Sequence, residues 1–161
     1  MKNERTIMPT VSVIVPCFNE EKTITLLLDA IYQQSFPKSE IEVIISDGMS
    51  TDRTREKIRE FCEAHEGFAV EIIDNPKRNI PSGINRAIKA ALGEIVVRLD
   101  AHSVPDHDYI LLCVAGHKSG KGENVGGVWE IRPSEDGWIA NSIAAAASHP
   151  LGVGDAKYRY G

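Results

Sequence analysis

The sequence predicts an α/β protein built on an open, mostly parallel sheet with helices on both faces. Four short runs of mainly β-branched apolar residues are typical of strands, and amphipathic segments with helical spacing separate them. The two kinds of segment alternate along the chain. This alternation favours right-handed crossovers between parallel strands, with helices packed on the sheet.

The predicted strands lie at residues 11–15, 41–45, 70–73 and 95–99. Their apolar residues run almost without interruption, as in strands that are buried on both faces of a parallel sheet. Between the strands, apolar residues spaced three and four apart predict three amphipathic helices. The apolar stripes are formed by Ile24, Leu27, Leu28 and Ile31, by Ile58, Phe61 and Cys62, and by Ile84, Ala87, Ile88, Ala91 and Leu92.

Local signals predict the helix ends and the elements after the fourth strand. Thr51 or Asp52 is expected to cap the start of the second helix, and Gly93 the end of the third. A fourth helix is expected over residues 106–118, and a fifth strand over 125–131.

Length and composition suit one globular domain. The chain has 161 residues, 42% of them hydrophobic and 25% charged, so we expect residues 1–161 to form one domain, truncated at its C-terminus. The formal net charge of -5 argues against a nucleic-acid-binding protein, which would carry a basic stripe. The three cysteines lack metal-binding spacing, and we expect them to be reduced, as in the cytosol.

The hydropathy pattern predicts a cytoplasmic protein. Residues 1–10 are polar and lack the apolar core of a secretory signal peptide. No apolar run approaches the ~20 residues of a membrane-spanning helix. Any attachment to a membrane is therefore expected to depend on segments outside this sequence.

Polar or acidic residues follow all four predicted strands. In an open α/β sheet, ligands bind beyond the carboxyl ends of the strands, which meet at one edge. The residues after the strands are Pro16-Cys17-Phe18-Asn19-Glu20, Ser46-Asp47-Gly48, Asp74-Asn75 and Asp100-Ala101-His102. We therefore predict a ligand site at this edge.

Asp100 and His102 form the sharpest signal for a metal site. Side chains two residues apart on an extended segment point the same way, so this carboxylate and imidazole are expected to converge. Oxygen and imidazole ligands suit Mn²⁺ or Mg²⁺, and Mn²⁺ tolerates nitrogen better. A helix N-cap or a surface turn is the alternative interpretation, and the position after a buried strand favours the metal site.

Other positions carry both a functional and a structural interpretation. Asp47, at a buried strand end, is predicted to accept a hydrogen bond from the base or ribose of a nucleotide. The turn at residues 16–20 forms a wall beside the nucleobase, or Asn19 caps the first helix and the next two glutamates complement its dipole. Arg78 meets a phosphate or stacks on a base, or it is a solvated surface arginine.

Several well-known motifs are absent from the sequence. The loop at residues 120–123 lacks the full pattern of a P-loop, and no G-x-G-x-x-G follows the first strand. No G-x-S-x-G elbow is present, which argues against an α/β-hydrolase. The remaining histidines have no obvious partner and are expected to be structural or exposed; they are His65, His107, His117 and His149.

Three stretches together resemble the family-two inverting glycosyltransferases, whose GT-A fold is Rossmann-like and binds nucleotide-sugars. They are VSVIVPCFNE at 11–20, ISDGMSTDRT at 45–54 and ALGEIVVRLDAHS at 91–103. The stretches GGVWEIRP at 126–133 and SHPLGVGDAKYRYG at 148–161 resemble a subgroup that makes succinoglycan and other exopolysaccharides.

The resemblance implies a role for each stretch. The first opens the nucleotide site, Asp47 faces the base, and Asp100 belongs to a D-x-D motif whose second acid is replaced by His102. The implied metal ligands are thus Asp100 and His102, for Mn²⁺ or Mg²⁺. The predicted substrate-binding residues are Pro16, Phe18, Asn19, Glu20, Asp47, Arg78 and Asp100.

The resemblance also implies the reaction and its partners. A sugar, favoured to come from a UDP-sugar, would pass with inversion to a saccharide or lipid-linked acceptor at the cytoplasmic face of the membrane. The family's catalytic base is an acidic residue of a later segment, which we expect beyond residue 161, together with the acceptor half. The fragment alone is therefore expected to be inactive or weakly active.

Three alternatives stay open on the sequence alone. A sugar nucleotidyltransferase would carry a Gly-, Arg- and Lys-rich loop after the first strand, and PCFNEEKT matches that poorly. A non-catalytic nucleotide-sugar-binding module is compatible with the missing base. A receiver-like signalling domain needs an acidic pair after the first strand, which Asn19-Glu20 does not provide.

Overall fold

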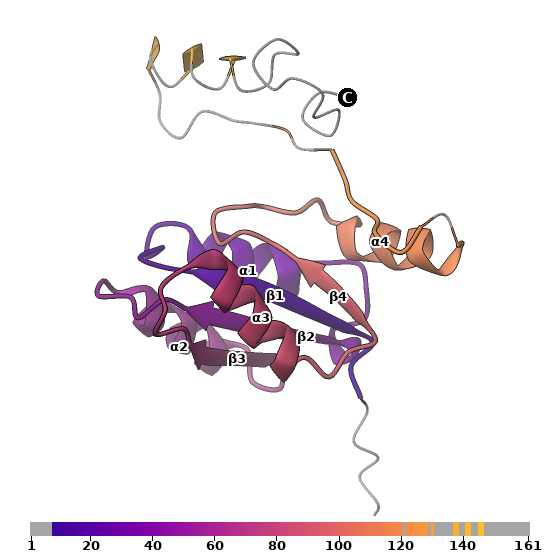
Figure 1. Cartoon of the computed structure of the whole chain (residues 1–161), viewed down its shortest axis with the longest axis horizontal. Coiled ribbons are helices and arrows are strands. Elements are labelled where there is room, and N and C mark those ends of the chain that lie inside the picture. Colours follow the sequence, from indigo (N-terminus) through magenta and orange to yellow (C-terminus); the bar gives the residue numbers. More distant parts are fainter. Residues whose placement is uncertain are drawn as a thin grey trace, which may run out of the picture. The chain divides into compact units, whose positions relative to one another are not determined.

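A computed structural model describes residues 8–120, 122–128, 130, 137–138, 141–142 and 145–146. The chain divides into two compact units, residues 1–114 and 115–161, and the first contains the whole sheet. Its strands are β1 (Val11–Cys17), β2 (Ile41–Asp47), β3 (Ala69–Asp74) and β4 (Ile95–Arg98). They form one parallel sheet in the order β3-β2-β1-β4 (Figure 1), which confirms the predicted fold class.

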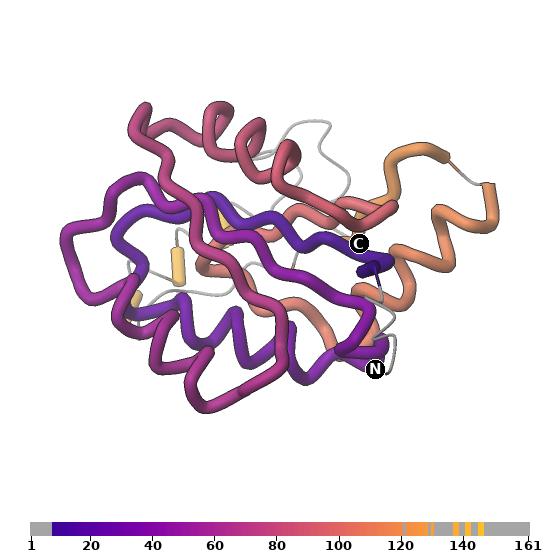
Figure 2. Tube along the Cα trace, turned by 90° about the horizontal axis from the view of Figure 1, so that it is seen from below, coloured from indigo at the N-terminus to yellow at the C-terminus, as the bar shows by residue number. Residues whose placement is uncertain are grey.

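The helices alternate with the strands as predicted. They are α1 (Ile24–Tyr32), α2 (Thr54–Ala64), α3 (Ile80–Ala90) and α4 (Tyr109–Lys118), with a short 3₁₀ turn, η1, at Lys38–Glu40. Helix α3 covers one face of the sheet, while α1 and α2 cover the other (Figure 2). The predicted covering of both faces is therefore confirmed.

Two apolar layers hold the sheet between the helices. On one face, the apolar odd-numbered residues of β1 and β2 pack with the buried stripe of α1, which includes Leu27 and Ile31. On the other face, Ile14 and Ile44 pack with Ala87 of α3. The two layers follow from side chains that alternate between the faces of a strand.

Burial differs between the central and the outer strands. Strands β1 and β2 are buried almost throughout. Strand β3 has no fully buried residue, and β4 exposes alternate residues, with Val96 42% exposed. The expectation that all four strands are buried on both faces is therefore wrong for the outer two. Among the described residues, each outer strand pairs with a neighbour on one side only, so it is less enclosed than the two central strands.

Three helix ends differ from the sequence prediction. Helix α2 is capped at Arg53 rather than at Thr51 or Asp52, although the Asp52 carboxylate still accepts the N–H of Thr54 at 3.0 Å. Helix α4 begins at Tyr109 rather than 106, because Asp106 closes a turn by accepting the N–H of Tyr109 (3.0 Å) through its carbonyl.

Helix α3 ends before the predicted Gly93. The chain turns to an extended conformation at Ala91, so Gly93 lies outside the helix. Its N–H instead donates to the Ser12 hydroxyl (2.8 Å) and to the Glu42 carboxylate (3.1 Å). Gly93 is thus needed for a close approach to β1 and not for a helix cap.

The fifth strand is not found where it was expected. Residues 125–128 and 130 have no strand conformation, and Trp129 and Ile131 lie outside the described residues, as does everything from 147 on. The adjacent Gly126 and Gly127 disfavour a strand because they lose the most backbone freedom and offer no side chain to pack.

Two global expectations concern cysteines and membranes. All three cysteines are free thiols, as predicted. Within the part of the chain that the structure describes, no helix has both the length and the apolar character needed to cross a bilayer.

We predict that Gly93→Ala lowers the free energy of unfolding by about 3 kcal/mol, because overpacking forces backbone shifts. The added Cβ would lie 2.7 Å from both the backbone nitrogen and the hydroxyl oxygen of Ser12. Urea denaturation measures the change. Gly122→Ala is the control, since its Cβ would find its nearest atoms at 3.6 and 3.9 Å. Equal stability of the two variants would contradict the close-approach explanation.

Candidate functional site

A cleft lies at the carboxyl edge of the sheet, lined by residues that follow all four strands. This is the edge at which the sequence predicted a ligand site. Of the predicted site residues, the cleft wall includes Pro16, Phe18, Glu20, Arg78, Asp100 and His102. Asn19 and Asp47 are close in sequence to the wall but do not line it.

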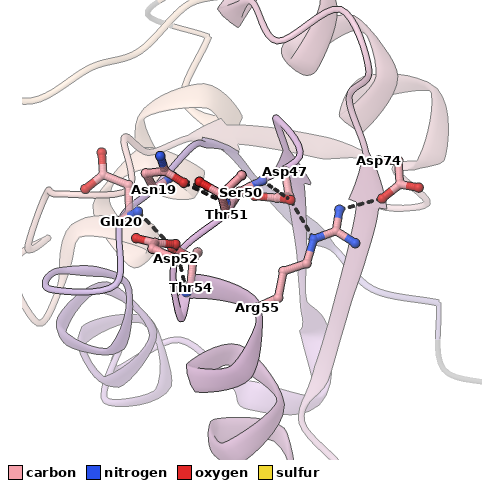
Figure 3. A network of polar contacts seen from close by, with 9 residues as sticks. All are labelled: Asn19, Glu20, Asp47, Ser50, Thr51, Asp52, Thr54, Arg55 and Asp74. Atoms are coloured by element: carbon pink, nitrogen blue, oxygen red, sulfur yellow. Dashed lines mark hydrogen bonds and ion pairs between the residues drawn. The ribbon is translucent and has the colours of Figure 1, made fainter.

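Asn19 joins the loop after β1 to the loop after β2 (Figure 3). Its side-chain oxygen accepts the N–H of Thr51 (2.9 Å), and its own N–H donates to the Ser50 hydroxyl (2.8 Å). Its backbone is left-handed (φ 54°), which asparagine tolerates better than most residues. The alternative that Asn19 caps α1 is wrong, because Thr23 occupies the N-cap position.

A second set of hydrogen bonds ties the same two loops together. The N–H of Glu20 donates to the Thr54 hydroxyl (2.8 Å), and the N–H of Glu21 donates to the Asp52 carboxylate (3.1 Å). Although burial opposes it, the hydrogen bonds from Thr54 and Glu21 hold the pKa of Asp52 below its usual value. Asp52 therefore holds the loops in place as a carboxylate.

Asp47 is fully buried at the end of β2 and is already engaged. Its carboxylate accepts hydrogen bonds from the N–H and hydroxyl of Ser50 (3.0 and 2.5 Å) and from Nε of Arg55 (2.6 Å). The same guanidinium reaches Asp74 at the end of β3, at 2.5 Å (Figure 3). In this arrangement Asp47 orders the wall of the cleft, and its contact with a nucleobase stays a prediction.

Sequence reasoning missed two arginines: Arg98, which lines the cleft, and Arg55, which supports its wall. Hydrogen bonds to Asp74 and Asp47 raise the pKa of the Arg55 guanidinium, so it stays charged. A signal was available, since a carboxylate at the end of a buried strand needs a counter-ion, and Arg55 lies in the first turn of the next helix.

Asp100 and His102 line the same cleft, but not for the expected reason. They lie in a turn, closed by the N–H and hydroxyl of Ser103, which donate to the Asp100 carbonyl at 2.9 and 2.7 Å. The expectation of an extended segment is therefore wrong, because the chain bends directly after β4. Nδ1 of His102 lies 3.3 Å from the Glu20 carboxylate across the cleft.

The donor set at Asp100 and His102 suits a cation that shares its ligands with a substrate. Among the described residues, no group of three or more acidic, histidine or cysteine side chains is placed to hold a metal on its own. Mg²⁺-type ions are usually held by one or two carboxylates together with substrate phosphates and water. One carboxylate and one imidazole facing an open cleft fit that requirement.

Positive groups lie in the same cleft. Arg78 and Arg98 both line it, and so does Asn79, the N-cap residue of α3, whose side chain accepts the N–H of Ser82 at 2.9 Å. A helix N-terminus carries a partial positive charge that favours anions. The cleft wall thus combines carboxylates, an imidazole, two guanidiniums and a helix N-terminus.

Cys17 also lines the cleft but is not suited to nucleophilic chemistry. Burial, helped by the nearby carboxylates of Asp47, Glu20 and Asp52, raises the pKa of its thiol to about 12. The thiolate is therefore scarce at neutral pH, and the thiol acts as a small packing group.

Comparison with known proteins identifies a family. The family profile described as glycosyl transferase family 2 matches residues 12–158. The succinoglycan biosynthesis protein ExoA of Rhizobium meliloti is 32% identical over 152 residues, which are 92% of this chain and 44% of ExoA. The dolichyl N-acetyl-alpha-D-glucosaminyl phosphate 3-beta-D-2,3-diacetamido-2,3-dideoxy-beta-D-glucuronosyltransferase of Methanococcus voltae is 38% identical over 103 residues, which are 64% of this chain and 32% of that protein.

The chain also matches solved structures. The mannosyltransferase PcManGT from Pyrobaculum calidifontis, in complex with GDP-Man and Mn²⁺, matches with a TM-score of 0.66 and 32% identity, over 89% of this chain and 41% of that one. TarS from S. aureus, in complex with UDP-GlcNAc, matches with a TM-score of 0.63 and 27% identity, over 78% of this chain and 38% of that one. The chain spans less than half the length of each of these proteins.

We predict that Arg55→Gln lowers the free energy of unfolding by about 2 kcal/mol, since it removes a charged hydrogen-bond donor from the buried Asp47. Arg53→Gln is a matched control, because Arg53 pairs with Glu56 on the surface, where its side chain is 62% exposed. That control is expected to change stability by less than about 0.5 kcal/mol. Thermal and urea unfolding test this, and a similar small loss in both variants would refute the structural role of Arg55.

Proposed function

This chain belongs to glycosyl transferase family 2, and from that premise we propose that its cleft binds a nucleoside diphosphate sugar together with a divalent cation. The observation that carries the proposal is the gathering of Asp100, His102, Arg78 and Arg98 in one cleft at the carboxyl edge of the sheet. Phosphate oxygens need both a cation and hydrogen-bond donors, and this cleft offers groups for both.

The donor's parts can be assigned to different walls of the cleft. We place the diphosphate near the guanidiniums of Arg78 and Arg98 and the start of α3, since these positively charged groups line the cleft. The nucleobase is placed beside Pro16 and Phe18 at the end of β1, with Asp47 and Asn19 ordering that wall from behind. Glu20 also lines the cleft, and its carboxylate lies 3.3 Å from Nδ1 of His102.

Asp100 and His102 would hold the divalent cation. When bound, such an ion acts as a Lewis acid that neutralises the negative charge developing on a leaving diphosphate. PcManGT, which was solved with Mn²⁺, supports the use of a divalent cation in this family. The imidazole in place of a second carboxylate favours Mn²⁺ over Mg²⁺ here.

The reaction we propose is an inverting glycosyl transfer. The oxygen of an acceptor hydroxyl forms a bond to the anomeric carbon while the bond from that carbon to the diphosphate oxygen breaks, and the hydroxyl proton passes to a general base. The described residues supply the donor side of this reaction. We place the base and the acceptor-binding surface outside them.

The partners are proposed by analogy with the relatives. A UDP-sugar is the favoured donor, although the solved neighbours carry both UDP-GlcNAc and GDP-Man. The relatives named for succinoglycan biosynthesis and for transfer to a dolichyl-linked sugar support a growing polysaccharide or lipid-linked saccharide as acceptor. This acceptor would place the whole protein at the cytoplasmic face of a membrane.

We expect UDP or GDP to bind in the presence of Mn²⁺, and Asp100→Ala to weaken that binding by at least about tenfold, as expected for a disturbed metal site. Isothermal titration calorimetry with each nucleotide, with and without Mn²⁺, measures the effect. Glu60→Ala is the control, because Glu60 lies exposed on α2 away from the cleft. The proposed site would be refuted if the nucleotide affinity changed neither on addition of Mn²⁺ nor in the Asp100→Ala variant.

A further inference from the structure

Arg98 lines the cleft next to Asp100, the proposed metal ligand. It is the last residue of β4, two residues before Asp100, and one of its terminal nitrogens lies 3.0 Å from the Asp100 carboxylate. Both residues line the cleft. The predicted ligand for a cation is therefore paired with a cation of the chain itself.

The ion pair between Arg98 and Asp100 is weak enough for Arg98 to change its partner. The contact uses one terminal nitrogen of Arg98, and the two side chains are 50% and 29% exposed. Half-exposed ion pairs with one contact contribute little free energy, because water screens them. A guanidinium has five N–H donors, so Arg98 keeps donors for a second partner.

The fold directs Arg98 toward the anion side of the cleft. Its register partner on β1 is Ile14, which packs under α3, so Arg98 lies on the same face of the sheet as α3. Arg78 and Asn79, at the start of α3, line the same cleft. The long side chain of Arg98 can therefore reach a diphosphate that binds between Arg98 and the start of α3.

We propose that Arg98 holds Asp100 in the metal-free protein and moves to the donor's diphosphate once Asp100 binds a divalent cation. The inference rests on the proposed function and assigns Arg98 a role within it. In the empty cleft the guanidinium neutralises a carboxylate that would repel the diphosphate. With the cation bound, Asp100 no longer needs Arg98, and a guanidinium suits a phosphate in bidentate geometry.

The consequence is opposite effects on two affinities. Arg98 competes with the cation for Asp100 but helps to bind the nucleotide. Removing Arg98 should therefore raise the affinity for the cation and lower the affinity for the nucleotide. An arginine that only fixes the Asp100 side chain would, when removed, weaken both. The sign of the change in metal affinity therefore separates the two roles.

The experiment compares Arg98→Gln with the wild-type chain and with Arg53→Gln, which removes an arginine from a surface ion pair outside the cleft. Mn²⁺ binding without nucleotide is measured from the electron paramagnetic resonance signal of free Mn²⁺. Binding of UDP and of GDP at saturating Mn²⁺ is measured by calorimetry. Circular dichroism and the urea midpoint confirm that each variant is folded.

For Arg98→Gln we expect Mn²⁺ affinity to rise about two- to fivefold, the range for an exposed ion pair. Nucleotide affinity at saturating Mn²⁺ should fall about tenfold, as for loss of a charged hydrogen bond. Arg98→Lys keeps the positive charge but loses the planar guanidinium that binds a phosphate through two N–H groups. This variant should retain wild-type Mn²⁺ affinity and lose part of the nucleotide affinity. Arg53→Gln should change neither.

Two outcomes would overturn the proposal while leaving the proposed function intact. One is that Mn²⁺ and nucleotide affinities both fall in Arg98→Gln, and the other is that neither changes although wild type binds nucleotide in an Mn²⁺-dependent way. If wild type itself shows no Mn²⁺-dependent binding of UDP or GDP, the proposed function fails and this inference fails with it.

Discussion

The neutralisation of one buried carboxylate organises this molecule. Asp47 ends a central strand where no water reaches it, and an isolated charge there would be prohibitively costly. Arg55 and Ser50 satisfy it, and Arg55 extends the tie to Asp74 on the neighbouring strand. Because these partners come from the loop after β2, from α2 and from β3, one requirement fixes the ends of two strands and the start of a helix.

That fixed frame carries backbone strain along the edge of the cleft. Asn19, Met49 and Arg78 have left-handed backbones, and they lie in the loops after β1, β2 and β3 respectively. Such conformations cost on the order of 1 kcal/mol or more for residues other than glycine, and they persist where the surroundings determine them. Hydrogen bonds between the loops after β1 and β2 hold those two loops in shape, and the loop after β3 is held by bonds of its own, such as that from the N–H of Arg78 to the Asn75 carbonyl.

Structural features that depend on residues close in sequence could be predicted, whereas features that depend on distant segments could not. The strands and the helix stripes follow from periodicity, because burial of Ile14 or Leu27 depends on a pattern within a few residues. Other features depend on residues that are distant in sequence. The exposure of Val96 depends on the strand order, and the role of Gly93 depends on its close approach to Ser12. The ion pairs of Arg55 depend on three separate segments of the chain. The clustering of Asp100 and His102 was anticipated from the sheet edge, yet the turn that produces it was not.

The strand order also sets a sequence of events during synthesis. β1 emerges first from the ribosome and lies inside the sheet, where it pairs with β2 on one side and with β4 on the other, Val11 opposite Ile95. One side of this apolar strand therefore stays open until β4, the last of the four strands in the chain, has been made. Asp100 and His102 follow immediately, so the cleft is the last part of the first unit's sheet edge to be completed, and a nascent chain would be unable to hold the proposed donor before its sheet had closed.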